Sequence, residues 1–242
     1  MIKVDNIKVF NFEGAIRGMR NPLNSWEKSD TVYIGVDCDE CPYQDECERL
    51  EICGDDCVLL GANDLDLMKR LYKGGSEHRK YLRQIFVSMD VLAPLYWWKE
   101  ADQYRINVTT NSCSTMHKIH AKEFTLDDFS CEHLDNTKKL QLGHNGNFGY
   151  DVYITSKSLL EITIGVLNYY REKFIETKNK EYWWQMIQLL PSSYNQKRTV
   201  TMNYENVMTM INQRSNHKLD EWRAFVEVLK GLPYVMDIRG EK

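Results

Sequence analysis

The stretch that decides the fold lies near the C-terminus and reads Val200-Thr201-Met202-Asn203-Tyr204-Glu205-Asn206-Val207-Met208-Thr209-Met210-Ile211-Asn212-Gln213-Arg214. Tyr204, Val207 and Ile211 recur at helical spacing and predict a helix over residues 204–214 with one buried face. Arg214 comes next on that face, where its charge is costly unless an anion, a carboxylate or carbonyl groups receive it. It either pairs locally and extends toward solvent at the helix end, or it marks a pocket for a phosphate or a flat heterocycle.

A second helix, predicted over residues 219–230, follows directly. The residues of its buried stripe are Leu219, Trp222, Val226 and Leu229. Arg223 lies beside this stripe, so we expect Arg214 and Arg223 to converge where the two helices meet. Asn216 is the expected N-cap, and Gly231 is the expected stop.

The rest of the chain alternates between strand-like and helix-like patterns. Strands are predicted over residues 3–12, 81–92 and 198–202, and helices over residues 14–19, 63–72, 95–103, 157–173 and 180–190. Residues 107–116 are rich in Ser, Thr and Asn and predict a loop, and residues 143–149 predict a turn. The fold class expected from these elements is α+β, a mixed sheet with long helices.

Composition places the chain among ordinary globular proteins. It has 242 residues, of which 43% are hydrophobic and 27% charged, and its formal net charge is −4. We therefore expect a single domain over residues 1–242. The negative balance argues against a nucleic-acid partner. No apolar run is long enough to cross a bilayer, and the first residues form no signal peptide, so we expect a cytoplasmic protein without a membrane partner.

Five of the seven cysteines crowd into one segment, residues 38–57, which is rich in Asp and Glu. They are Cys38, Cys41, Cys47, Cys53 and Cys57. The opening C-x2-C places two thiolates on one side of a short turn, where both can bind one metal. Zinc or an iron–sulfur cluster fits such a set, and a reduced loop or a disulfide pair is the alternative. We interpret residues 38–57 as a cysteine-rich insertion within the domain.

Several short pieces follow one another in a telling order between residues 75 and 230. They are Ser76-Glu77-His78, Pro94 with Tyr96 to Arg105, Asn111-Ser112-Cys113-Ser114, Leu190-Pro191, Thr201-Met202-Asn203, Asn212-Gln213-Arg214 and Glu221-Trp222-Arg223. Their order resembles that of the flavin-dependent thymidylate synthase family, which carries Ser-x-Glu-His-like, Arg-His-Arg, Asn-Glu-x-Ser and Asn-x-Arg pieces. The resemblance covers about two thirds of the chain. The family does not ordinarily carry the cysteine cluster.

The resemblance implies transfer of a one-carbon unit from methylene-tetrahydrofolate to C5 of a pyrimidine deoxynucleotide monophosphate. It also implies FAD, NADPH and a homotetramer, with sites formed between subunits. The residues expected to hold the flavin are His78, Arg105, Asn212 and Arg214. The residues expected to bind the nucleotide are Glu100, Gln103, Asn111, Ser114, Lys197, Arg198 and Arg223. Ser114 and the basic residues suit the phosphate, because hydroxyls and cations donate to its oxygens.

The chain departs from the family at several places, two of which bear on the choice of substrate. Gln103-Tyr104-Arg105 replaces Arg-His-Arg, and Glu100 replaces a glutamine. A carboxylate accepts a hydrogen bond from an exocyclic amine, so dCMP is a candidate substrate beside dUMP. The alternative function is a catalytically inactive nucleotide-binding relative with a metal-stabilised cysteine cluster. A third is a metal-stabilised protein whose likeness to the synthases is in the fold alone.

Each of these residues also has a purely structural interpretation. His78 can cap a strand, and Arg105 can pair with Glu100 or Asp102 in a local ion pair. Cys113 has no obvious base near it in the sequence, and the resemblance needs no covalent cysteine, so we assign it no nucleophilic role.

Overall fold

The computed structural model describes residues 2–34, 57–144 and 151–240, and it divides into two compact units. The first unit comprises residues 2–92, 100–111 and 198 to the C-terminus, and the second comprises residues 93–99 and 112–197. Cys38, Cys41, Cys47 and Cys53 lie outside the described residues, as does most of the turn predicted over residues 143–149.

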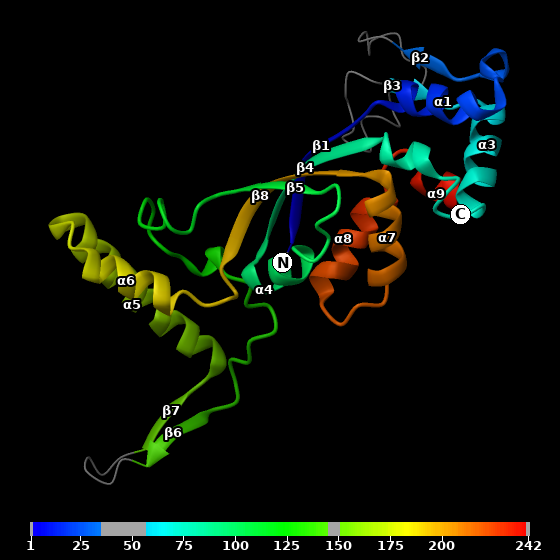
Figure 1. Cartoon of the computed structure of the whole chain (residues 1–242). Coiled ribbons are helices and arrows are strands. Elements are labelled where there is room, and N and C mark those ends of the chain that lie inside the picture. Colours follow the sequence, from blue (N-terminus) through cyan, green and yellow to red (C-terminus); the bar gives the residue numbers. More distant parts are fainter. Residues whose placement is uncertain (1, 35–56, 145–150, 241–242) are drawn as a thin grey trace. The chain divides into compact units, whose positions relative to one another are not determined.

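A four-stranded sheet runs in the order β1 (Lys3–Phe10), β4 (Phe86–Pro94), β8 (Asn195–Asn203) and β5 (Thr109–Ser112), as Figure 1 shows. In β4 the buried residues alternate with half-buried ones, the period of a strand that buries one face more deeply. The loop predicted over residues 107–116 is wrong at β5. This strand is exposed along its whole length, so it has no apolar alternation and belongs to the sheet through its backbone alone.

Strands β1 and β4 pair antiparallel, with Val9 opposite Val87 and Val4 opposite Val91. The register shifts between Asp5 and Lys8, where Asn6 has a φ of 53°. Asparagine tolerates this left-handed conformation better than most residues do, and an extra residue there produces a β-bulge.

Of the residues that the structure describes, five helices belong to the first unit: α1 (Phe12–Arg20), α3 (Ala62–Lys73), α7 (Tyr204–Arg214), α8 (Asp220–Lys230) and α9 (Val235–Arg239). Helices α7 and α8, orange in Figure 1, pack against each other, and α3 packs against α9. The predicted bounds and buried stripe of α7 are confirmed. The predicted N-cap of α8 is wrong: Leu219 occupies the cap position without a side-chain bond. Helix α9 was not predicted, because five residues are too few to show a helical period.

Among the described residues, 3-10 turns occur at Asn21–Leu23, Trp26–Lys28 and Lys80–Arg83 in the first unit, and at Leu126–Asp128 in the second. The third of them occupies the start of the strand predicted over residues 81–92, so that β4 begins only at Phe86. Tyr81 and Leu82 in this turn are buried, which explains why their apolar character resembled a strand in the sequence.

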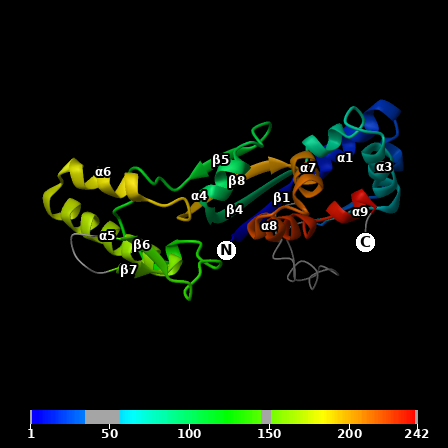
Figure 2. The same ribbon diagram turned by 90° about the horizontal axis from the view of Figure 1, so that it is seen from below.

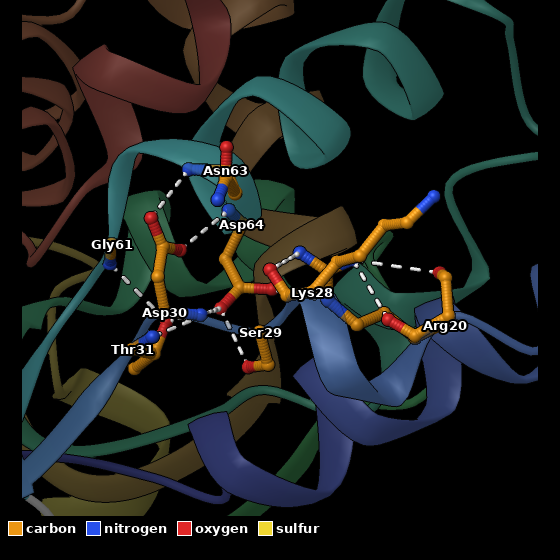
Figure 3. Close-up of polar contacts among 9 residues, drawn as sticks. Arg20, Lys28, Ser29, Asp30, Thr31, Gly61, Asn63 and Asp64 are labelled. Atoms are coloured by element: carbon orange, nitrogen blue, oxygen red, sulfur yellow. Dashed lines mark hydrogen bonds and ion pairs between the residues drawn. The ribbon is translucent and has the colours of Figure 1, made fainter.

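A buried polar cluster, the Asp64 network, joins α1, α3 and the segment between them (Figure 3). Asp64 has no exposed surface, and its Oδ1 accepts a hydrogen bond from Nε of Arg20 at 2.6 Å. Its Oδ2 accepts from the hydroxyls of Ser29 and Thr31, and from the backbone N–H groups of Asp30 and Thr31. The network thereby satisfies a buried charge on both oxygens.

The Asp64 network lies beside a two-stranded hairpin, β2 (Val32–Ile34) and β3 (Cys57–Leu59), in which Ile34 is opposite Cys57. Asp30 caps α3 by accepting from the N–H groups of Asn63 and Asp64. A Cβ placed on Gly61 would lie 2.1 Å from Oδ1 of Asp30, so only glycine fits there. Both ends of the segment between Ile34 and Cys57 are therefore anchored.

The second unit contains most of α4 (Leu95–Ala101), a helical pair, α5 (Ser156–Thr177) and α6 (Lys180–Leu189), and a hairpin, β6 (Leu140–His144) with β7 (Asp151–Ile154). Helices α5 and α6 pack against each other, as Figures 1 and 2 show. The buried residues of this unit's core are Ile119, Phe124, Phe129, Leu160, Ile164, Leu167 and Met186. A reciprocal side-chain cap between Thr155 and Ser158 starts α5, and Lys178 in the left-handed conformation ends it.

One face of α5 carries apolar residues that stay exposed: Leu159, Ile162, Val166 and Tyr169. Their spacing of three and four residues places them in one stripe. Within the described ranges, no helix is long and apolar enough to cross a membrane.

Candidate functional site

Five residues of the first unit meet around one guanidinium and are called the Arg214 cluster here: Glu100, Tyr104, Arg214, His217 and Trp222. Glu100 is in the last turn of α4, and Tyr104 lies in the turn that follows it. Arg214 is the last residue of α7, and Trp222 is in the first turn of α8. The short connection between α7 and α8 supplies His217. The order of the elements thus brings residues more than a hundred positions apart to one place.

Arg214 is held on its edge and on its face. Its Nε donates to the hydroxyl of Tyr104 at 2.9 Å, and its Nη1 donates to Oε2 of Glu100 at 3.2 Å. Its Cζ lies 4.8 Å from the centre of the Trp222 ring, which is the geometry of a cation–π contact. The guanidinium is thus paired and stacked, although 21% of the side chain stays exposed.

Two donors reach one oxygen of Glu100, and a ring nitrogen lies beside it. Besides Arg214, its Oε2 accepts from Nε1 of Trp222 at 3.1 Å and contacts Nε2 of His217 at 3.2 Å. No described residue donates to the other oxygen, Oε1. The Glu100 side chain is 39% exposed, so the carboxylate is fixed from one side and open on the other.

The hydrogen bonds of His217 define its tautomer. Its Nδ1 accepts from the backbone N–H of Leu219 at 3.2 Å, so this nitrogen carries no proton. The neutral ring must then be protonated on Nε2, which is the atom that faces Glu100. In this tautomer the Nε2–H group of His217 lies beside the carboxylate oxygen.

The remaining residues predicted to bind flavin have separate surroundings in the first unit. His78 is exposed in the turn after α3, where its N–H donates to the carbonyl of Gly75. Arg105 is exposed, and its Nε donates to the carbonyl of Asp102. Asn212 accepts a hydrogen bond from Arg239 at 2.7 Å. Asn212 and Arg214 share α7, but the contacts of Arg105 and His78 are local.

The residues predicted to bind the nucleotide in the first unit are mostly engaged with neighbours. Arg198 donates to Oδ1 of Asp102 at 2.7 Å. Arg223 pairs with Asp220 and donates to the carbonyls of His217 and Lys218, so it closes the turn before α8. The expected convergence of Arg214 and Arg223 is indirect. The ring of His217 faces Glu100, and its carbonyl receives Arg223.

Two further residues of that first-unit set, Gln103 and Asn111, have exposed side chains. Gln103 lies in the turn after α4, where its N–H donates to the carbonyl of Glu100. Asn111 lies on β5.

In the second unit, Ser114 and Lys197 lie close together. The N–H of Cys113 donates to the carbonyl of Lys197 at 2.9 Å, and the carbonyl of Cys113 accepts from Gln196. The hydroxyl oxygen of Ser114 accepts from the N–H groups of Met116 and His117. Its own hydrogen has no acceptor among the described residues and can be donated to a ligand. Cys113 is exposed and is not in a disulfide.

The predicted metal site falls largely outside the described residues, because only the backbone of Cys57 is described, at the start of β3. Elsewhere in the described ranges, no group of three or more His, Cys, Asp or Glu residues is arranged to hold a metal ion.

Three residues of the Arg214 cluster were not predicted from the sequence as parts of a site: Tyr104, His217 and Trp222. The sequence placed Trp222 on a buried stripe and Tyr104 in a replaced motif, but neither position gives its partner. His217 carries the weakest signal, because it lies in a turn and acts only on a residue distant in the chain.

Comparisons by sequence and by structure give different results. No model of a known protein family matches the sequence, and no curated protein matches it. By structure, the chain is similar to Thymidylate Synthase X (ThyX) from Helicobacter pylori, crystallised with FAD and dUMP. The TM-score is 0.60 at 15% identity, over 99% of this chain and 97% of that one. A second structure of that enzyme, also with FAD and dUMP, has a TM-score of 0.60 at 16% identity, over 98% and 97% of the two chains.

The chain is also similar to the UMP/dUMP methylase PolB from Streptomyces cacaoi, bound with 5-Br dUMP. The TM-score is 0.53 at 13% identity, over 95% of this chain and 88% of that one. Identities this low establish the architecture and leave the chemistry to the site itself. The predicted fold class is confirmed, and the chain has the α+β fold of the flavin-dependent thymidylate synthases.

Proposed function

We propose that the chain is a flavin-dependent enzyme that transfers a one-carbon unit from methylene-tetrahydrofolate to C5 of a pyrimidine deoxynucleotide monophosphate, dUMP or dCMP. FAD is the proposed cofactor, and NADPH the proposed reductant. The observation that carries the proposal is the Arg214 cluster. It is built mainly from three of the pieces that resemble the synthase family, in a chain whose fold matches that family over nearly its full length.

The donor set of Arg214 fits a flavin nucleotide. Both N–H groups of Nη2 and one of Nη1 have no acceptor among the described residues, and together they form the flat edge of the guanidinium. That edge suits paired acceptor atoms, such as ring or phosphate oxygens. A bound reduced flavin supplies the hydride, while the protein positions the rings and stabilises charge. Arg214 therefore serves as a binding and orienting group.

The loop at Ser114 fits the nucleotide phosphate. A phosphate needs hydroxyl, N–H and cationic donors. Ser114 has a hydroxyl hydrogen to donate. Lys197 lies on β8, where its carbonyl accepts a hydrogen bond from the N–H of Cys113, the residue before Ser114. We propose that these two residues of the second unit bind the phosphate. Of the residues proposed to contact the nucleotide in the first unit, Asn111 and Gln103 have exposed side chains.

One observation favours the second candidate, an inactive nucleotide-binding relative. Tyr104 stands where the resemblance has the histidine of Arg-His-Arg, and its hydroxyl is used inside the protein, between Arg214 and Gln213. A residue engaged in this way is less free to contact a ligand. Flavin content separates the two candidates directly.

The decisive experiment is a visible spectrum of anaerobically purified protein, followed by titration with FAD and reduction with NADPH. The enzyme proposal expects a flavin band that NADPH bleaches, and turnover of dUMP or dCMP in the presence of methylene-tetrahydrofolate. Flavin binding without turnover of either nucleotide would favour the inactive relative. A protein that takes up no FAD would contradict the enzyme proposal.

We also propose that the chain forms a homo-oligomer through α5. The exposed stripe of Leu159, Ile162, Val166 and Tyr169 has a spacing that is the same in both directions, so two copies can pack antiparallel along it. Ile162→Glu should reduce the mass measured by light scattering. Ile175→Glu is the matched control, since helical geometry places Ile175 on the opposite side of α5 from Val166. Equal masses for all three proteins would exclude this surface.

The cysteine segment remains a separate proposal from its spacing. We propose that four of Cys38, Cys41, Cys47, Cys53 and Cys57 bind zinc or an iron–sulfur cluster. Metal analysis should find about one zinc, or iron with sulfide, per chain, and Cys38→Ser with Cys41→Ser should remove it. A metal-free protein with full FAD uptake would leave the segment without a metal role.

A further inference from the structure

The orientation of Arg214 is an open question for any ligand, because it ends a helix and carries a long side chain. A free arginine side chain has a rotamer entropy of about 2 kcal/mol at room temperature. A binding site that uses such a residue gains affinity when the protein has already fixed it. Such a gain requires contacts that hold the guanidinium of Arg214 in place before a ligand binds.

Glu100 is at the centre of these contacts. Its Oε2 receives Nη1 of Arg214 from α7, Nε1 of Trp222 from α8, and faces Nε2 of His217 from the turn between them. Groups from three elements converge on this one oxygen and hold the carboxylate from one side. The indole of Trp222 then supports the face of the guanidinium that the carboxylate holds at its edge.

The tautomer of His217 determines which ring nitrogen faces Glu100. The N–H of Leu219 fixes Nδ1 as an acceptor, which leaves the proton on Nε2, pointing to Glu100. The ring of His217 also packs edge-on to Trp222, with ring centres 6.1 Å apart. His217 thus contacts the carboxylate through Nε2 and touches the indole that stacks on Arg214.

We propose that Glu100 and His217 are positioning residues that hold Arg214, so that its outer edge is ready for the acceptor atoms of the flavin nucleotide. The part of this inference that concerns flavin rests on the proposed function. The role goes beyond a direct contact between Glu100 and the nucleotide, because it acts through Oε2, whereas a ligand would meet Oε1.

The first test needs no ligand. The Nε–H of Arg214 is hydrogen-bonded to Tyr104, so it should give a resolved, slowly exchanging signal in a ¹H–¹⁵N spectrum. Arg214→Lys identifies the signal by removing it. Glu100→Ala removes the acceptor of Nη1, and His217→Phe removes the polar group beside that acceptor. Each change should therefore accelerate the exchange by about tenfold or more. His217→Gln should restore slow exchange, because its amide offers both an acceptor and a donor.

The second test measures FAD affinity in the same variants. Glu100→Ala and His217→Phe should raise the dissociation constant of FAD by about tenfold, and His217→Gln should stay within about threefold of the unchanged protein. Glu100→Gln keeps the shape and an acceptor, so it should fall between the two. Arg70→Ala, on the exposed face of α3, is the control for loss of an arginine elsewhere.

Two results would overturn the inference. One is slow exchange of the Arg214 signal in both Glu100→Ala and His217→Phe. The other is unchanged FAD affinity in these variants when Arg214→Ala abolishes binding. If the unchanged protein takes up no FAD, the proposed function fails, and the exchange measurement alone decides whether Glu100 and His217 position Arg214.

Discussion

Two arginine–carboxylate pairs of the first unit, Arg20 with Asp64 and Arg214 with Glu100, differ in how completely they are satisfied. In the Asp64 network, Arg20 and Asp64 have side-chain exposures of 4% and 0%, and both carboxylate oxygens accept hydrogen bonds. Arg20 also donates to the carbonyls of Ser25 and Lys28. In the Arg214 cluster, the pair is 21% and 39% exposed, and Oε1 of Glu100 and one edge of Arg214 have no described partner.

This difference separates a structural pair from a binding pair. A buried charge costs several kcal/mol unless it is fully paired. In the Asp64 network all three nitrogens of Arg20 and both oxygens of Asp64 are hydrogen-bonded within the protein. In the Arg214 cluster the desolvation cost is smaller, because both side chains are partly exposed. The N–H groups of Arg214 that have no described acceptor remain available to a ligand. The same two residue types therefore serve folding in one place and, by our proposal, recognition in the other.

The largest expected effect is on the structural pair. Asp64→Ala leaves the buried Arg20 without its carboxylate, so we expect the free energy of unfolding to fall by about 3–5 kcal/mol. Urea denaturation measures it. Asp66→Ala is the matched control on the same helix, because its pair with Arg70 is 66% exposed on each side and should matter by less than about 1 kcal/mol. Equal losses in both variants would refute the comparison.

The Asp64 network should also make stability depend on acid. Burial raises the pKa of Asp64, but hydrogen bonds from Thr31, Ser29 and Arg20 outweigh it and lower the pKa below the ordinary value of 3.8. A lowered folded-state pKa contributes stability above the unfolded pKa and loses it as the pH falls through the folded one. We expect unfolding free energy to decline below about pH 4, and less so in Asp64→Asn. Parallel curves for the two proteins would contradict this.

A change in the pair of Arg214 and Glu100 should alter the affinity for FAD more than it alters stability. Arg214→Ala removes an edge of donors and a stacked cation, so we expect the dissociation constant of FAD to rise by about 10- to 100-fold. The free energy of unfolding should change by about 1 kcal/mol or less, since the side chain is partly exposed and Glu100 keeps the Trp222 donor and the nearby ring of His217. A large stability loss with intact FAD binding would make Arg214 structural.

The smallest effect is expected at Arg223, which pairs with exposed Asp220. Arg223→Gln should lower the free energy of unfolding by less than about 1 kcal/mol and leave nucleotide affinity within about threefold, because its donors already close the turn. Titration with dUMP and dCMP measures the affinity. A tenfold loss for either nucleotide would instead support the direct contact predicted from the sequence.

The parts of the fold that were predictable are those with a long apolar period. Helix α7 carries its buried stripe over three turns, so its bounds emerged from the sequence unchanged. Strand β5 has no such signal, because its residues are exposed and only backbone bonds place it in the sheet. The start of α8 was predicted one residue early, since no side-chain cap marks it.

The site was predictable only where a residue violated a local rule. Arg214 stood out because a charge ended a buried stripe, and the structure supplies its partners. Glu100 was noticed only as a replaced residue in a resemblance, and nothing in the sequence indicated that it faces Arg214. His217 acts through hydrogen bonds to distant or backbone groups, which no local pattern encodes.

The hairpin of β2 and β3 has a consequence for how this chain can change over time. Ile34 and Cys57 are paired across it. Hydrogen bonds in the Asp64 network also hold Thr31 and Gly61, which flank the two strands, so the two ends of the connecting segment are close together. With the ends already closed, doubling the length of the connecting segment costs only about 0.6 kcal/mol in closure entropy. The segment between Ile34 and Cys57 can therefore be lengthened, shortened or replaced during evolution without compensating changes in the rest of the protein.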